Sequence, residues 1–388
     1  MHIMGNNISP RVRLEVDLGV LRGNYRKIEK RVRPAEVLSV VKANAYGLGA
    51  AVFARTLHSA GCRRFGVADA REAAEIVSLG LKGATVQMLS SVFPDEIAPM
   101  VAAGVVLPVT GIAEAKLISA AAVRLGRDAH VHFKVDTAMG RLGIRAADAL
   151  ATIVAASRLP RIVCEGVMTH FPVASDPRDP TTAGQIEEMR RLVSAAAENG
   201  VRFRYVHAAA SDGINSFSAA ARPPFNLVRA GLDLHGGFTA AARRIGMKSV
   251  LTFKARIVQV RDLPAGTTVG YGRTFVLKRR SRIAVVAAGY ADGVPLAISN
   301  RGTVFVNGAA CPVAGRVSMD YTSVDVTRAG DVCPGDFAVL LGTSGRRSVM
   351  PDDWGRQKGT HAHDVLCAIG PRAVRIYRGG PKATAAEG

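Results

Sequence analysis

Cysteine is scarce in this chain, and its placement excludes two classes of small, cross-linked protein. Five cysteines are spread over 388 residues, their number is odd, and no CxxC pair is present. A disulfide framework needs paired cysteines, and a structural zinc site needs clustered ligands. The sequence therefore predicts neither disulfides nor a bound metal, and it favours a reducing, cytoplasmic compartment.

Long apolar runs are also missing. No stretch approaches the ~20 apolar residues that a membrane-spanning helix needs. The opening segment, MHIMGNNISPRVRLEVDL, contains no apolar core of the kind found in signal peptides. We therefore expect no membrane association and no secretion by that route.

Acidic residues are few relative to basic ones. The chain has 31 Asp and Glu against 51 Lys and Arg, a formal net charge of +20. Such an excess is typical of proteins that bind phosphate backbones. Here, however, the basic residues are dispersed, with only short clusters such as 278–280, and no nucleic-acid-binding motif is visible. We expect no specific nucleic-acid partner and interpret the charge as an arginine-rich surface.

What the chain does contain is a regular alternation of short apolar runs and helix-like segments from about residue 36 onward. Ala- and Glu-bearing segments such as 70–81 and 183–200 separate most of the apolar runs. Apolar strands alternating with helices predict a parallel sheet covered on both faces, and eight such units fit a TIM-like α/β barrel. The eight expected strands are 37–43, 64–69, 85–89, 105–110, 130–136, 164–170, 205–211 and 227–233.

The pattern changes near residue 247. Val- and Thr-rich runs at 250–260, 283–289, 302–308 and 321–326 are separated by short Gly and Pro turns, and long helices disappear. This pattern is typical of a mostly antiparallel β domain. We therefore expect a barrel over 11–246, a mostly β C-terminal domain over 247–378 and a frayed tail over 379–388. The first strand-like piece, 11–18, could pair with either domain.

Polar side chains at the ends of the expected barrel strands are the candidates for chemistry. Lys42 closes the first strand, in VVKANAYGLG. A lysine leaving an apolar strand is costly to bury, and desolvation would lower its pKa and make it a Schiff-base nucleophile. Taken alone, Lys42 is more simply a surface lysine whose stem packs on apolar neighbours. Its context favours a catalytic role, because active sites of barrels lie at the carboxyl ends of the strands. The other polar residues expected there are Lys134, Asp136, Arg141, His170, Ser211 and Arg229.

Eight motifs along the chain resemble those of the alanine racemase family. They are LEVDLGVLRGNYRKI, VVKANAYGLG, KVDTAMGRLG, GVMTHF, NLVRAGLDLHG, VGYGRTF, AAGYADG and AGRVSMD, in the family's order and spacing. The resemblance covers nearly the whole chain. It implies an isomerase that depends on pyridoxal 5′-phosphate, with a barrel that binds the cofactor, a C-terminal β domain, and a head-to-tail homodimer whose active sites are shared across the interface.

The resemblance also assigns roles to single residues. Lys42 would hold the cofactor covalently and act as one base, serving the D-enantiomer. Tyr271, in VGYGRTF, matches the second base, which serves the L-enantiomer and comes from the partner subunit. His170 matches the histidine that supports this tyrosine, with Arg229 behind it and facing the pyridine nitrogen of the cofactor. Outside its motif, Tyr271 would be interpreted as a turn tyrosine, and Arg229 as an ordinary salt-bridge residue.

Further matches assign the remaining contacts. Those expected at the cofactor phosphate are Tyr46, Ser211, Gly231 and Leu232. Arg141 matches an arginine near the cofactor and the substrate, and Lys134 matches a lysine that is often carbamylated and holds that arginine. Substrate-pocket positions are matched by Met319, Asp320 and Tyr290.

Four positions depart from the family's common pattern. Ala210 stands where many relatives have asparagine, Leu296 where an arginine often follows GYADG, Ser318 where a cysteine sometimes occurs, and Pro371 where some members have tyrosine. Loss of the phenol at 371 removes a hydrogen bond and could widen the pocket. Because pockets discriminate poorly against an added methylene or hydroxyl, serine or a larger amino acid stays an alternative to alanine.

Two other interpretations use the same first-strand lysine. A decarboxylase of the same fold would carry glycine-rich phosphate loops and a C-terminal cysteine–aspartate pair, which we do not find. A non-catalytic carrier of pyridoxal phosphate would lack the second domain and Tyr271. The motifs favour an alanine racemase that interconverts L- and D-alanine, either for D-alanine biosynthesis or for catabolism.

Overall fold

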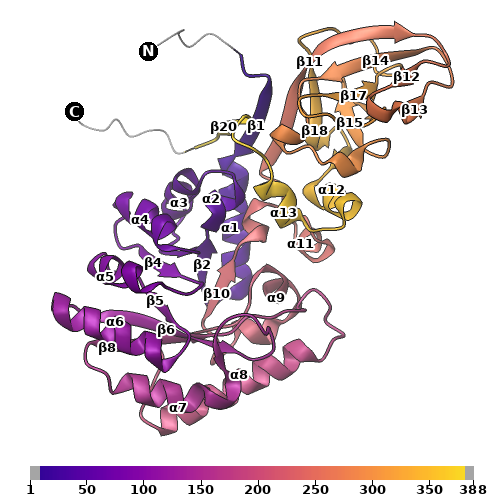
Figure 1. Cartoon of the computed structure of the whole chain (residues 1–388). Coiled ribbons are helices and arrows are strands. Elements are labelled where there is room, and N and C mark those ends of the chain that lie inside the picture. Colours follow the sequence, from indigo (N-terminus) through magenta and orange to yellow (C-terminus); the bar gives the residue numbers. More distant parts are fainter. Residues whose placement is uncertain (1–8, 381–388) are drawn as a thin grey trace, which may run out of the picture. The chain divides into compact units, whose positions relative to one another are not determined.

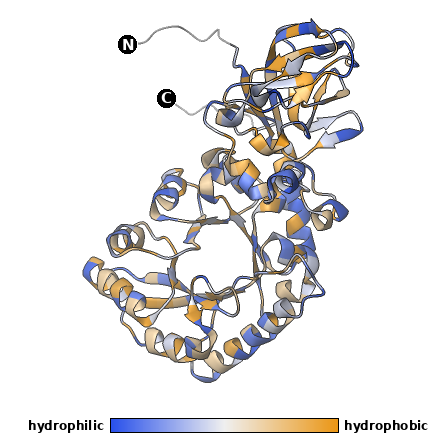
Figure 2. Cartoon of the chain, turned by 45° about the vertical axis from the view of Figure 1, so that its right-hand side comes forward, coloured by the Kyte–Doolittle hydropathy of each residue, from blue (hydrophilic) through white to orange (hydrophobic). Residues whose placement is uncertain are grey.

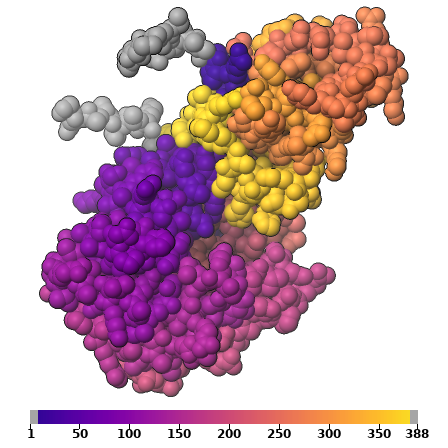
Figure 3. Space-filling view, in the orientation of Figure 1, coloured from indigo at the N-terminus to yellow at the C-terminus, as the bar shows by residue number. Residues whose placement is uncertain are grey.

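The computed structural model describes residues 9–380, which form two compact units. The barrel unit comprises Leu21–Ala45 and Gly49–Lys248, and the β unit comprises residues 9–20, Tyr46–Leu48 and residues 249–380. In the space-filling view of Figure 3, the indigo residues of the first strand lie with the orange and yellow residues of the β unit. Among the described residues, no helix is both long and apolar enough to span a membrane.

The barrel unit contains a closed ring of eight parallel strands, as the sequence predicts. β2, β3, β4 and β10 pair in the order β10-β2-β3-β4, and β5, β6, β8 and β9 pair in the order β5-β6-β8-β9. A parallel bridge between Gln87 and Val106 joins the two sheets on one side. On the other side, the Asn226 N–H donates to the Val206 carbonyl at 3.1 Å. The strands are β2 (Glu36–Val40), β3 (Arg64–Val67), β4 (Thr85–Met88), β5 (Leu107–Val109), β6 (Ala129–Asp136), β8 (Ile162–Met168), β9 (Tyr205–His207) and β10 (Leu227–Ala230).

Amphipathic helices surround this ring, and in Figure 2 they carry both hydrophobic and hydrophilic residues along their length. The helix expected over 70–81 begins after Asp69, whose carboxylate accepts from the Glu72 N–H at 2.9 Å, and it ends at Ser78. Gly80 follows in the left-handed region, with φ of 61°, which stops the helix early. The longer helices are α1 (Leu18–Val32), α3 (Ala50–Ser59), α4 (Ala70–Ser78), α5 (Pro94–Ala102), α6 (Ile112–Leu125), α7 (Ala146–Ser157) and α8 (Thr181–Glu198). Shorter pieces are β7 (Ile144–Arg145), α9 (Ser211–Ser216), α10 (Leu232–His235) and α11 (Ala240–Arg244).

The β unit is built around one long strand, β11 (Leu251–Leu263). This strand pairs antiparallel with β1 (Val12–Asp17), β14 (Ser281–Val286) and β18 (Phe337–Ser344). Its pairing shifts register between Ile257 and Gln259, which lets one strand serve partners from two sheets. The remaining elements are β12 (Thr268–Val269), β13 (Phe275–Val276), β15 (Thr303–Val306), β16 (Ala309–Pro312), β17 (Thr322–Asp325), β19 (Arg347–Val349), β20 (Val374–Arg378), α12 (Pro351–Lys358) and α13 (Ala362–Cys367). A barrel followed by a mostly β domain is therefore confirmed (Figure 1).

The expected domain ranges differ from these units in two places. Strand β1, placed at the start of the expected barrel range 11–246, pairs antiparallel with β11 and parallel with β20, both in the β unit. Residues Tyr46–Leu48 also belong to that unit, because the Gly47 and Leu48 carbonyls accept from Arg375 and Tyr377 of β20. Of the tail expected over 379–388, residues 381–388 lie outside the described part of the chain.

Candidate active site

The carboxyl ends of the barrel strands carry the polar residues that the sequence singles out. Lys42 follows the end of β2, His170 follows the end of β8, and Lys134 and Arg229 lie within β6 and β10. All eight strands run parallel, so these ends meet at one rim of the ring. The positive charges of Arg229, Arg141 and Lys42 all help to lower the pKa of Lys134, as expected for groups at the same rim.

Lys42 stands at the start of an unusual turn, labelled α2 (Lys42–Tyr46). Ala43, Asn44, Ala45 and Tyr46 all have φ between 50° and 53°, in the left-handed region. For residues with a Cβ, this conformation costs about 1–2 kcal/mol each. Glu72 of α4 compensates, because its carboxylate accepts from the Ala43 N–H at 2.6 Å and from the Ala68 N–H at 2.7 Å. The strained turn therefore fixes the chain directly after Lys42.

Arg229 is buried within the barrel and makes a dense set of hydrogen bonds. Its Nη2 donates to the carbonyls of Thr169 and Ala208, both at 2.7 Å, and lies 3.1 Å from His170 Nδ1. Its Nη1 lies 3.0 Å from His207 Nδ1. Burial lowers the pKa of Arg229 to about 10, so the guanidinium stays charged at neutral pH. It is a fixed cation that can only donate.

His170 is held in its neutral form. Burial, followed by the charges of Arg229 and Arg141, lowers its pKa to about 3. Because Arg229 can only donate, His170 Nδ1 must accept, and the single ring proton lies on Nε2. His170 therefore presents an N–H donor away from Arg229.

Lys134 and Arg141 flank the tight turn after β6. Lys134 Nζ donates to the Leu89 carbonyl at 2.6 Å. Burial, together with the charges of Arg229 and Arg141, lowers the pKa of Lys134 to about 8. The carboxylate of Asp136 accepts from the Met139 N–H at 2.7 Å and the Arg141 N–H at 3.1 Å, so it shapes the turn that carries Arg141.

Ser211 and the start of α10 form a cluster of small donor groups. Ser211 Oγ accepts from the Gly231 N–H at 3.3 Å and the Asp233 N–H at 3.2 Å, and Leu232 lies between these two amides. The residue before Ser211, Ala210, has no side chain that could cap α9. The structure thus brings together Ser211, Gly231 and Leu232, three of the four residues expected at a phosphate.

The fourth, Tyr46, lies in the β unit. Its side chain is buried and packs edge-on against the ring of His363, with ring centroids 5.4 Å apart.

The β unit gathers the other expected residues on neighbouring loops. The Tyr290 N–H donates to the Ser318 carbonyl at 3.0 Å, and the Ala291 N–H donates to the Met319 carbonyl at 3.1 Å. Gly270, just before Tyr271, has φ of 76°, and an added Cβ would lie 3.0 Å from the Arg316 nitrogen. The side chains of Tyr271, Tyr290 and Met319 are 73%, 49% and 53% exposed. Each of these side chains is thus open to a partner molecule.

Comparison with known proteins decides the family. Residues 16–238 match the family model of the alanine racemase N-terminal domain, and residues 250–377 match that of the C-terminal domain. The chain belongs to the alanine racemase family. It is similar to the alanine racemases of Halothermothrix orenii, at 33% identity over 94% of this chain and 96% of the relative, and of Carboxydothermus hydrogenoformans, at 35% over 94% and 98%.

Solved structures of the family have the same fold. Alanine racemase from the D-cycloserine producer Streptomyces lavendulae has a TM-score of 0.89 and 32% identity, covering 97% of this chain and 99% of that one. The alanine racemase of Bartonella henselae, solved with covalently bound pyridoxal phosphate, has a TM-score of 0.86 and 27% identity over 96% and 100%. The similarity spans both units of this racemase-family chain.

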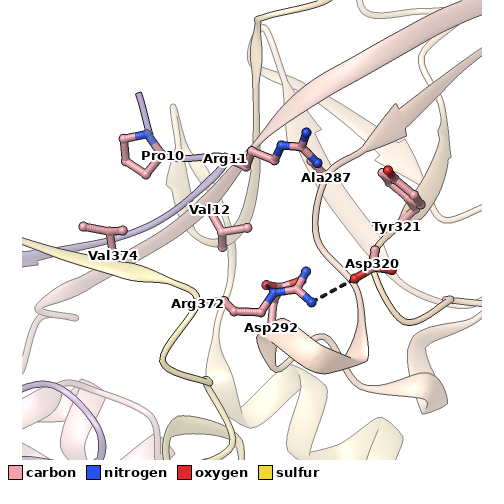
Figure 4. Close-up of a pocket in the computed structure, with 9 residues that line it drawn as sticks. All are labelled: Pro10, Arg11, Val12, Ala287, Asp292, Asp320, Tyr321, Arg372 and Val374. Atoms are coloured by element: carbon pink, nitrogen blue, oxygen red, sulfur yellow. Dashed lines mark hydrogen bonds and ion pairs between the residues drawn. The ribbon is translucent and has the colours of Figure 1, made fainter. Parts of the chain in front are cut away.

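A cavity of about 580 Å³ in the β unit is lined by Asp320, one of the residues expected at the substrate, and by Asp292 and Arg372 (Figure 4). Arg372 is paired there with Asp320 at 2.8 Å and with the buried carboxylate of Asp292 at 3.0 Å. Pro371, the departure from the common pattern, directly precedes Arg372, and it is exposed. The sequence did not single out Asp292, which lies in the motif AAGYADG, or Arg372, which follows Pro371.

Four further residues with polar contacts to the site were also missed: Glu72, His132, Glu165 and His207. The alternation in HVHFKVD was an available signal, because it places His130, His132 and Lys134 on one face of β6. His207 lies within the expected strand 205–211, four residues before Ser211. Glu72 had no such signal, since it stands among other charged residues of a helix.

Proposed function

We propose that this chain interconverts L-alanine and D-alanine with pyridoxal 5′-phosphate as cofactor, as a two-base racemase. The observation that carries the proposal is the arrangement at the barrel rim. A charged, donor-only Arg229 holds a neutral His170, and Lys42 stands at the neighbouring strand end. Family membership over both units supports the same function.

The residues present fit the cofactor. An amine at a strand end can hold an aldehyde covalently, the Ser211 hydroxyl with the amides beside it suits a phosphate, and a buried guanidinium suits a ring nitrogen. When bound, pyridoxal phosphate supplies an electron sink that acidifies the Cα–H of an attached amino acid. Arg229 can only donate, so it would keep the pyridine nitrogen unprotonated, which favours return of a proton at Cα over transamination.

Two residues would move the proton. We propose that Lys42 Nζ takes the Cα proton from D-alanine and that Tyr271 Oη of the partner subunit takes it from L-alanine. His170 would support that tyrosine, because its Nε2–H is the only ring proton left after Nδ1 accepts from Arg229. The exposure of Tyr271, Tyr290 and Met319, together with family membership, supports a homodimer in which each active site draws Tyr271, Tyr290, Met319 and Asp320 from the partner.

We also propose that Lys134 is carbamylated. Only a neutral amine adds to carbon dioxide, and the lowered pKa of Lys134 makes a substantial neutral fraction available at neutral pH. A carbamate would replace a cation repelled by Arg229 and Arg141 with an anion attracted by both. Intact-mass measurement under native conditions should then show one added carbon dioxide per chain, absent from Lys134→Ala.

Serine, or a broader set of amino acids, is the second candidate for the substrate. The observation that favours it is the presence of Ala210, Leu296 and Pro371, since the family pattern often has asparagine at the first position and arginine at the second, and some members have tyrosine at the third. Each replacement removes a group that could exclude a longer side chain from the pocket.

A cytoplasmic location stays a prediction from cysteine usage.

The deciding experiment follows loss of optical rotation for a panel of L-amino acids incubated with purified protein and pyridoxal phosphate. Rapid racemisation of alanine alone supports an alanine-specific racemase. Racemisation of serine or larger amino acids supports the second candidate, with the same mechanism and a different or broader substrate range. No racemisation of any amino acid, despite bound cofactor, contradicts the proposal and favours a carrier. Lys42→Ala is the control, because it should lose both the covalent cofactor and the activity.

A further inference from the structure

The interior of this barrel differs from the usual one. Most (β/α)8 barrels are filled with branched aliphatic side chains, and burying polar groups there is costly. Here His132 and His207 are completely buried, and Arg229 is 5% exposed and Glu165 9% exposed. An added Cβ on Gly166 would lie 2.6 Å from the His132 ring. Gly166 therefore leaves the space that the imidazole of His132 occupies.

These four side chains form a line in which close nitrogen–nitrogen contacts run from Arg229 to His132 and Glu165 stands at the far end. Arg229 Nη1 lies 3.0 Å from His207 Nδ1, and His207 Nε2 lies 2.8 Å from His132 Nδ1. His132 Nε2 and Glu165 Oε2 are 3.8 Å apart, and among the described residues neither atom has a hydrogen-bond partner. The line begins beside His170 at the catalytic rim and ends at Glu165.

The donor chemistry of Arg229 determines which ring nitrogen carries the proton in His207 and in His132. A guanidinium can only donate, so His207 Nδ1 accepts and its proton lies on Nε2. That proton is donated to His132 Nδ1, and the proton of His132 is therefore also on Nε2. It points toward Glu165, whose ionised carboxylate can only accept. The obligatory donor Arg229 therefore permits one tautomer of each imidazole, and the His132 proton faces the carboxylate of Glu165.

The electrostatics agree with this pattern. Burial and the charge of Arg229 hold the pKa of His207 well below its usual value, and burial lowers that of His132. Burial opposes ionisation of Glu165, but His130 and His132 outweigh it and hold the pKa of Glu165 well below its usual range. Among the described residues, Arg229 has no ion pair with a carboxylate, so the negative charge of Glu165 is the counter-charge at the far end of the line.

We propose that Glu165 and His132 are positioning residues, which act through His207 to hold Arg229, and with it His170, in the orientation that racemisation requires. This inference rests on the proposed function for its kinetic part only. The tautomers of the two histidines test the line itself, whether or not the chain racemises alanine.

The test combines nitrogen NMR of ¹⁵N-histidine-labelled holoenzyme with kinetics. In the wild-type protein at neutral pH, His132 and His207 should both be neutral with the proton on Nε2. In Glu165→Gln, the negative charge that faces His132 Nε2 is lost, so the ¹⁵N shift of that nitrogen should change while the tautomer set by Arg229 stays the same. The kcat should fall roughly tenfold, because misplaced catalytic groups are costly, while KM changes little. The matched control is Glu187→Gln on α8, which removes an exposed carboxylate that pairs with Arg190 at 2.9 Å and contacts none of the four side chains.

A steric variant tests the same line without changing any charge. Gly166→Ala should displace the His132 ring and reduce kcat, whereas Gly184→Ala on α8, where an added Cβ meets nothing within 4 Å, should leave it unchanged. A charged or Nδ1-protonated His207 in the wild-type protein would overturn the proposal. A fall in kcat in Glu165→Gln with an unchanged ¹⁵N shift of His132 Nε2 would also overturn it, because Glu165 would then act through the fold alone. Absence of racemisation in the wild-type protein, with the expected tautomers, would instead refute the proposed function.

Discussion

Arg229 Nη2 lies 3.1 Å from His170 Nδ1, and this contact sets the protonation of the histidine that faces the catalytic rim. A cationic donor makes the nitrogen it faces an acceptor and disfavours a second charge on the ring. Buried imidazole and buried guanidinium are each costly alone, but together they provide one neutral donor of defined direction. Catalysis and stability should both depend on this arrangement and on the turn that carries Lys42.

Tyr271→Phe should retain the cofactor and lose racemisation. The phenol oxygen is the only atom removed, and Tyr271 is 73% exposed in this chain, so the free energy of unfolding should change little. The visible absorbance of the bound cofactor and the rate of optical-rotation loss measure the two effects separately. Near-normal racemisation by the purified variant would contradict the proposal that Tyr271 is one of the two bases.

Glu72→Gln should loosen the turn after Lys42. The carboxylate accepts from two backbone amides, and replacing a charged acceptor with a neutral one at strained backbone should cost about 1–3 kcal/mol of stability. The urea midpoint and the affinity for pyridoxal phosphate should both fall. Glu75→Gln, an exposed position on the same helix, is the matched control and should change neither quantity. Equal behaviour of the two variants would contradict the role given to Glu72.

Stability should decline as the pH falls below neutrality. The folded-state pKa of His170 is lowered to about 3, and those of His132 and His207 are also lowered, so these rings stay neutral while the unfolded chain takes up protons below its ordinary histidine pKa. The unfolded state then binds more protons, which favours unfolding from about pH 6.5 downward. Urea midpoints measured between neutral and mildly acidic pH check this, and a flat profile would show that the three rings are protonated in the fold.

The titration of His130 should change the free energy of unfolding in the opposite direction to that of the three buried histidines. The carboxylate of Glu165, 3.5 Å away, raises the folded-state pKa of His130. Its contribution to stability is therefore full below the unfolded pKa and is lost as the pH rises through the raised value. His130→Gln should remove that part of the pH dependence and leave the acid limb intact. The difference between the urea midpoints of the variant and of the wild-type protein, measured as a function of pH, gives the contribution of His130.

Pro371→Tyr should narrow the substrate range. It restores a phenol that some relatives have, directly before Arg372 at the cavity beside Asp320. Added bulk and a hydroxyl should lower kcat/KM for serine and larger amino acids more than for alanine, by roughly tenfold for one unfavourable contact. Racemisation rates for alanine and serine measure the ratio. An unchanged ratio would show that position 371 does not line the substrate site.

The sequence by itself determined the fold class and the strand ends that carry Lys42, Lys134, His170 and Arg229. Hydrophobic period and chain order are local properties, so eight strands and their helices could be predicted directly. The eight motifs likewise indicated the family, because each is a contiguous run of residues that can be recognised without its spatial neighbours. The finer limits of elements were less predictable, as at Ser78, where helix α4 ends before the expected residue 81.

Only the tertiary structure decided which side chains meet across the barrel. The line from Arg229 to Glu165 joins residues on β10, β9, β6 and β8. No local sequence pattern specifies that these four side chains lie next to one another inside the barrel. The same holds for Glu72, which reaches the backbone of Ala43 from a helix, and for β1, whose partners β11 and β20 lie near the other end of the chain. Proton positions depend on such long-range contacts, because each imidazole takes its tautomer from the neighbour that the closed ring places beside it.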